Sequence, residues 1–140
     1  MDALALTHLI SLCLWGGLVL GEIVLELAPR DEGERRAAAR FHHAIDLLVE
    51  IPLLAVVVAS GVLLAIRAWP LSPLHYLKIA AALIAIGANA ACVGLVVARR
   101  RRLEDPAALA AYRRRIAVTV AVGLPGGLLA LVLGLRYFAH

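Results

Sequence analysis

The chain has 140 residues, of which 63% are hydrophobic and 17% charged, and its formal net charge at pH 7 is +4. Its mean hydropathy is +0.90. A soluble domain of this size has too much water-exposed surface for such a balance, so the composition excludes a soluble globular enzyme and indicates a membrane protein.

Four apolar segments follow one another, each long enough to cross a hydrocarbon core, which takes about 20 helical residues. They are predicted at Ala3–Ala28, His42–Ala68, Leu74–Ala98 and Ala107–Phe138. Short connections favour an up-down-up-down order. The predicted fold is therefore all-α: one transmembrane domain, an integral membrane antiparallel four-helix bundle. The start Met1-Asp2-Ala3 has no basic region, so we expect the first segment to be a retained helix and not a signal peptide.

Arginines concentrate in the first and third connections, and their distribution sets the predicted orientation. The first connection carries Arg30, Arg35, Arg36 and Arg40, and the third carries Arg99 to Arg102 with Arg113 to Arg115 soon after, whereas the second has only Arg67 and the C-terminal end only Arg136. We therefore expect these two connections to be cytoplasmic and both termini to lie outside. The arginines also suit anionic headgroups, so membrane lipid is an expected partner. Nucleic acid is not expected, because no recognition motif accompanies them.

Ionisable residues within the apolar segments are the main functional signal. A charged side chain at the bilayer centre costs roughly 2.5–3.5 kcal/mol on insertion scales, so a cluster of them marks a functional site. Carboxylates and imidazoles that converge between helices are the donors from which metal sites in bundle cores are built. We predict that a transition metal ion, namely iron, copper, manganese or zinc, is bound by six residues: Glu22, Glu26, His42, His43, Asp46 and Glu50.

Two other interpretations of this acidic cluster stay open. The members nearest the interface, Glu26, His42 and His43, also suit simple hydration or pairing with Arg30 or Arg40. Alternatively, stacked carboxylates conduct protons or cations, although the mainly apolar span towards the outer leaflet argues against a continuous route. The alternative function is thus a non-enzymatic membrane subunit, as a homo-oligomer or with a partner subunit.

Helical phase separates the remaining polar residues from packing residues. At 100° per residue, His8, Trp15, Glu22 and Glu26 lie within about 40° of one another on the first segment, and this stripe must face the bundle. The fourth segment instead has small residues around Pro125, namely Thr119, Gly123, Gly126 and Gly127. Small residues permit close backbone approach, so we expect the fourth helix to serve packing.

Two short sequence blocks resemble a known pattern. Thr7-His8-Leu9-Ile10 is followed by Leu14-Trp15-Gly16-Gly17-Leu18, and the third segment opens with Leu74-His75-Tyr76-Leu77-Lys78. These blocks resemble the bacterial membrane-bound protoporphyrinogen oxidases that carry haem b, and a related His…Trp-x-Gly-Gly arrangement occurs in the copper-resistance D family. The resemblance implies a haem b cofactor, His8 and Lys78 as the functional pair, and a bacterial inner membrane, which would place both termini in the periplasm.

Haem also has support that does not depend on this resemblance. His8 and His75 begin the first and third segments at the same leaflet, and neutral imidazoles on facing helices are ordinary axial ligands. His8, His75 and Lys78 are therefore the candidate haem-binding residues. The predicted function is to bind a metal or haem centre inside the bundle for redox chemistry, and whether the protein is an enzyme stays open.

Overall fold

The computed structural model describes residues 2–136, which are almost entirely helical. In chain order the elements are α1 (Ala3–Leu27), α2 (Glu32–Ile45), the π-helical turn η1 (Asp46–Glu50), α3 (Ile51–Arg67), α4 (Pro73–Arg100) and α5 (Pro106–Arg136). Because α2, η1 and α3 form one unbroken helical stretch, four stretches are long and apolar enough to cross a membrane. The prediction of an all-α chain with four such segments is confirmed.

The second helical stretch differs most from the sequence prediction, because it begins at Glu32 and not at His42. The Asp31 carboxylate accepts a hydrogen bond from the Glu34 amide at 2.8 Å, and the Glu34 carboxylate accepts one from the Arg30 amide at 2.6 Å. These two bonds satisfy amides that have no partner at a helix start. The charged residues of the first connection therefore start a helix. The other predicted boundaries differ by one or two residues, and the predicted end of the fourth segment at Phe138 lies outside the described residues.

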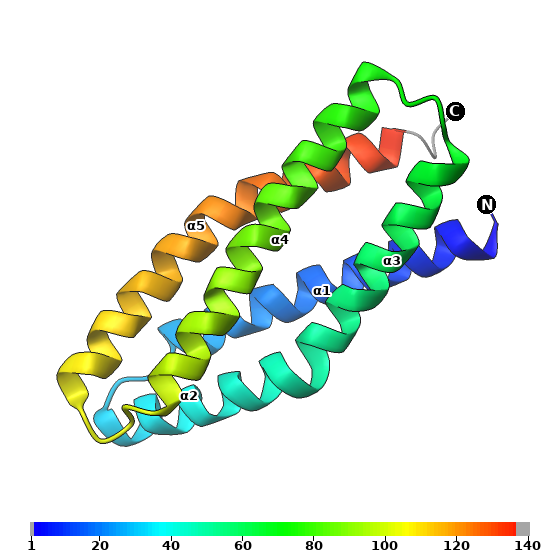
Figure 1. Ribbon diagram of the computed structural model, residues 1–140. Coiled ribbons are helices and arrows are strands. Elements are labelled where there is room, and N and C mark those ends of the chain that lie inside the picture. The colour runs from blue at the N-terminus through cyan, green and yellow to red at the C-terminus, as the bar shows by residue number, and fades with distance from the viewer. Residues whose placement is uncertain (1, 137–140) are drawn as a thin grey trace.

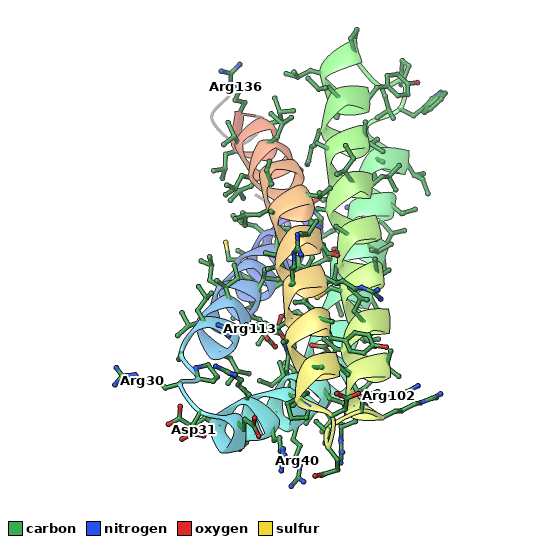
Figure 2. All side chains as sticks on the ribbon, turned by 90° about the vertical axis from the view of Figure 1, so that its left-hand side faces the viewer. Arg30, Asp31, Arg40, Arg102, Arg113 and Arg136 are labelled. Carbon is green, nitrogen blue, oxygen red and sulfur yellow. The ribbon has the colours of Figure 1, made fainter. Side chains whose placement is uncertain are left out.

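The α1–α2 and α4–α5 connections lie at one end of the molecule, and the α3–α4 connection and the start of α1 lie at the other (Figure 1). We call the first the inner end and the second the outer end. The chain changes direction between α2 and α3, so α2 lies across the inner end while α3 runs along the molecule, as both views show (Figures 1 and 2).

The α4–α5 pair is packed through small side chains. A β-carbon on Gly126 would lie 2.9 Å from the carbonyl oxygen of Ala81, and one on Gly123 would lie 2.7 Å from the β-carbon of Ala88. Neither contact leaves room for a larger residue. The glycines of the fourth predicted segment thus have the packing role that the sequence indicated.

Apolar side chains point outward as well as inward. A buried cluster of Trp15, Val57 and Ala85 joins α1, α3 and α4, and a second cluster of Cys92, Val96 and Ile116 joins α4 to α5. Large apolar side chains are nevertheless exposed on all the long helices. The buried residues include many small and polar ones. Five of the buried polar residues lie towards the inner end, namely Glu22, His42, Asp46, Glu50 and Arg99.

Candidate metal centre

The turn η1 positions two of the acidic side chains. The amide of Ile51 donates to the carbonyl of Asp46, one residue further back than in an α-helix. Pro52 explains this wider turn, because proline has no N–H and its ring crowds the carbonyl four residues earlier. Within the turn, Asp46 and Glu50 are both buried, with 1% and 2% of their surface exposed. The local irregularity therefore turns two carboxylates inward.

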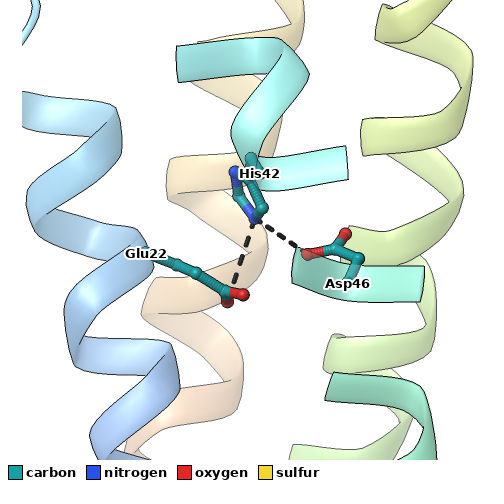
Figure 3. A group of neighbouring side chains, drawn as sticks. All are labelled: Glu22, His42 and Asp46. Carbon is teal, nitrogen blue, oxygen red and sulfur yellow. Dashed lines mark ion pairs between the residues drawn. The ribbon is translucent and has the colours of Figure 1, made fainter. Parts of the chain in front are cut away.

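His42 is the centre of the acidic cluster and is 2% exposed. Its Nε2 atom lies 3.3 Å from Oδ1 of Asp46 and 3.8 Å from Oε2 of Glu22. The three side chains come from α1, α2 and η1 and point toward one another (Figure 3). One ligand atom from each lies within 4.8 Å of the others. This is the convergence that the sequence predicted between the first and second helical stretches.

The other ring nitrogen of His42 is held by Glu26. Nδ1 lies 2.5 Å from Oε1 of Glu26, and a carboxylate can only accept, so Nδ1 carries the proton and donates it. In the neutral form of the ring the lone pair is then on Nε2, which faces Glu22 and Asp46. A carboxylate that orients a histidine in this way is the usual second partner of a metal-binding imidazole.

Glu26 is in turn held by Arg99. The guanidinium donates from Nη1 to Oε2 at 2.8 Å and from Nη2 to Oε1 at 2.7 Å, which makes a bidentate ion pair. Nη2 also lies 3.2 Å from Nδ1 of His42, but both atoms are donors, so they share Oε1 of Glu26 and do not bond to each other. Arg99 is 3% exposed. Glu26 is therefore a fully paired carboxylate.

The carboxylates that face Nε2 are not paired in this way. Both oxygens of Asp46 and Oε1 of Glu22 are buried and have no hydrogen-bond partner. Leaving such a group unpaired costs several kcal/mol, so buried carboxylates are normally paired or coordinate metals. Donors bound about 2.0–2.2 Å from one tetrahedral ion lie about 3.3–3.6 Å apart, close to the separations from Nε2 seen here. The donor set of one imidazole and two carboxylates thus fits a transition metal ion.

Glu50 belongs to a neighbouring network. Its Oε1 accepts from Nε1 of Trp15 at 3.1 Å and from Nδ2 of Asn89 at 2.5 Å. Trp15, which the sequence placed on the same stripe of the first segment as His8 and Glu22, thus reaches the acidic cluster with its indole. Glu50 itself is outside the group of three converging donors, as is His43, which is half-buried on α2.

A cavity of about 420 Å³ adjoins Glu22 and Glu50. Its walls are otherwise mostly apolar and come from α1, α4 and α5, with Trp15 and Asn89 at the polar side. Gly16 and Leu20 line it and are exposed, so the cavity reaches the surface of the helices. A small apolar molecule could therefore reach the acidic cluster from the side of the bundle.

The candidate haem residues lie towards the outer end. Nδ1 of His8 is 2.9 Å from Oγ of Ser60, and the ring packs over Gly61, where a β-carbon would lie 3.1 Å from Cε1. His75 is half-buried on the first turn of α4, and its Nδ1 is 2.9 Å from Oγ of Ser72. Lys78 is half-buried with its amine near Gly134.

Arg99 is the residue of this centre that the sequence interpretation missed. It was counted as a loop arginine of the third connection, but it lies in the last turn of α4 and is buried. The expected partners of Glu26 were Arg30 and Arg40, and both are exposed. The spacing of buried residues on α4 carried the missing signal, since Cys92, Val96 and Arg99 follow at intervals of four and three on one helical face.

Searches for similar proteins found no match for this chain among protein-family models, curated proteins or solved structures.

Proposed function

We propose that the protein is an antiparallel four-helix bundle embedded in a bacterial inner membrane. Contiguous exposed apolar patches are rare on soluble monomers, and the long helices expose many leucine, isoleucine and valine side chains. Arg30, Arg40 and Arg102 gather at the inner end, while Arg136 lies at the opposite end (Figure 2). This asymmetry supports a cytoplasmic inner end and periplasmic termini. In that setting α2 lies along the cytoplasmic surface.

We further propose that the inner end binds a transition metal ion through Nε2 of His42 and the carboxylates of Glu22 and Asp46. The observation that carries this proposal is Asp46, whose two oxygens are buried without partners 3.3 Å from the lone-pair nitrogen of His42. Glu26 and Arg99 act as positioning residues, because they fix the tautomer of His42 without facing the ion. Nitrogen and oxygen donors suit iron, manganese, zinc or copper.

Three protein ligands leave coordination positions free for water or a substrate, as in catalytic metal sites. The cavity beside Glu22 offers a route to such a position from the lipid side. With iron, manganese or copper the centre would perform redox chemistry, which is the function we propose. With zinc the same geometry would activate a water molecule.

Metal analysis of the purified protein with matched variants tests this function. Asp46→Asn keeps the shape of the side chain but replaces a charged ligand by a neutral amide, so metal affinity should fall at least about tenfold. Glu104→Gln is the matched control, because it removes one negative charge from an exposed side chain in the α4–α5 connection. Equal metal content and affinity in wild type and Asp46→Asn would refute the centre. If wild-type protein bound no metal at all, the alternative of a non-enzymatic proton- or cation-carrying subunit would take its place.

Haem b is a second proposal, which comes from the sequence resemblance. Of the candidate residues, His8 has the more favourable setting, since it is buried beside a glycine, but neither it nor His75 lines the 420 Å³ cavity. An absorption spectrum separates this proposal from the metal centre. A Soret band lost in His8→Ala would support haem, whereas a colourless protein with bound metal would leave only the carboxylate–histidine centre.

A further inference from the structure

A second cavity, of about 400 Å³, lies at the inner end between α2, the last turn of α4 and the first half of α5. Its charged wall consists of four arginines and one carboxylate, and the remainder is mainly alanine, leucine and proline. The charged residues are Arg35, Arg99, Arg113, Arg114 and Glu26. The cavity adjoins the Glu26–Arg99 pair, and none of the three converging metal donors lines it.

The charges of this wall do not cancel. Arg99 is neutralised by Glu26, with which it makes two hydrogen bonds. Among residues 2–136, no ion pair within 4.0 Å involves Arg35, Arg113 or Arg114. Three positive charges without an ion-pair partner, on the exposed Arg35 and Arg114 and the half-buried Arg113, therefore line one open cavity. In addition, Nε of Arg99 is buried without a hydrogen-bond partner. Both observations indicate that an anion completes this cavity.

The chemistry of the wall favours a phosphate group. Arginine guanidinium groups match phosphate oxygens in a fork geometry, and arginine is preferred where phosphate is recognised. The apolar part of the wall, including Leu109 and Ala117, has no role for a free inorganic ion. About one and two turns beyond Arg114 on α5, Val118 and Val122 are exposed and apolar, and acyl chains can lie along them. A headgroup with its chains attached fits both parts.

We propose that this cavity binds the headgroup of an anionic phospholipid. The inference rests on the membrane embedding proposed above and is independent of whether the metal centre is occupied. The inner end is at headgroup level in that orientation, where anionic lipids are attracted by arginine side chains. Arg99 and Glu26 line this cavity, and Glu26 also accepts the hydrogen bond from His42, so these residues connect the lipid site to the metal centre. The lipid would thus help to hold α2 and α5 together around the acidic cluster.

Native mass spectrometry of the full chain as purified, released from detergent, provides the test. Wild-type protein should retain phosphatidylglycerol in preference to phosphatidylcholine. The double variant Arg113→Gln/Arg114→Gln removes two of the unpaired charges, and at about 1 kcal/mol each its affinity for phosphatidylglycerol should fall about thirtyfold. The matched control, Arg101→Gln/Arg102→Gln, removes the same charge from exposed residues that do not line the cavity and should bind like wild type.

The single variant Arg35→Gln removes a positive charge from the α2 side of the cavity, opposite Arg113 and Arg114 on α5. It should lower the affinity for phosphatidylglycerol about fivefold, so the test stays valid if the double variant fails to fold. Equal losses in the cavity and control variants would mean diffuse surface attraction and would overturn the site. Equal retention of the two lipids would also overturn it. Displacement of the lipid by millimolar inorganic phosphate, with phosphate alone bound as tightly, would identify a free-phosphate site. Metal content, measured on separate samples, tests the metal centre independently of these outcomes.

Discussion

Removal of the Arg99 guanidinium should be one of the most costly single changes in this chain. Arg99→Met keeps most of the volume of the side chain but leaves the Glu26 carboxylate with only the Nδ1–H of His42. Breaking a buried ion pair by deleting one partner costs about 3–5 kcal/mol, because the remaining charge is buried without compensation. Arg99 is 3% exposed and Glu26 keeps one donor, so we expect a loss near the lower limit, about 3 kcal/mol.

A double-mutant cycle separates the pairing from the general cost of changing buried residues. Unfolding would be followed by circular dichroism in mixed micelles during titration with a denaturing detergent. The variants are Arg99→Met, Glu26→Gln, both together, and Arg102→Met as an exposed control. The double variant should be less destabilised than the sum of the single variants by at least about 1.5 kcal/mol, since contacting residues are coupled. A loss below about 1 kcal/mol for Arg99→Met, or a coupling near zero, would refute the buried pair.

The same variants report on the metal centre through His42. Glu26→Gln no longer offers a carboxylate to Nδ1, so the tautomer with its lone pair on Nε2 is less favoured. Loss of such a partner lowers metal affinity by about 10- to 100-fold. Unchanged affinity in a folded Glu26→Gln protein would mean that Glu26 does not orient His42 for an ion.

Four further outcomes are expected. Gly126→Ala should destabilise the α4–α5 pair by at least about 1 kcal/mol, because its β-carbon would lie 2.9 Å from a backbone carbonyl oxygen. The control Gly16→Ala, whose β-carbon would have no neighbour within 4 Å, should stabilise the protein slightly. Equal effects of the two substitutions in a thermal melt would contradict the packing. A reporter that is active only in the cytoplasm should work when fused after Arg102 and fail after Pro70, and the reverse pattern would invert the topology. His8→Ala should remove or shift a Soret band, if purified wild-type protein shows one. The free energy of unfolding should be about 2.7 kcal/mol lower after a chelator removes the metal than in a solution whose free metal concentration is 100 times the dissociation constant. An unchanged unfolding midpoint would argue against a bound ion.

The sequence predicted the convergence of donors because the relevant spacing is local. Glu22 is on the same stripe of α1 as Trp15, and His42 and Asp46 are one helical turn apart, so facing helices bring them together. His43 and Glu50 were grouped with them because His43, Asp46 and Glu50 follow the helical spacing i, i+3 and i+7. The widened turn before Pro52 changes the direction of the side chains there, and a constant 100° rotation cannot describe it.

The burial of Arg99 could not follow from arginine counts. Such counts treat each arginine near a helix end as a loop charge, which is correct for the exposed Arg101 and Arg102. Helical phase distinguishes Arg99, because it continues the face of Val96 and Cys92. The sequence interpretation also missed the start of α2 at Glu32, because it relied on charge in the same way. Charged residues on that stretch were taken as a connection, although a helix that lies across the end of a bundle needs only one apolar face.

The balance of charge at the inner end connects these findings. Glu22, Glu26, Asp46 and Glu50 are all largely buried, and in the part of the chain that the structure describes Arg99 is the one fully buried cation beside them. Arg99 compensates Glu26, and the Trp15 and Asn89 donors support Glu50. Glu22 and Asp46 have no such support from the protein. A divalent ion bound to both would supply the missing positive charge where the protein provides none, and this is why ion binding and stability of the inner end should be linked.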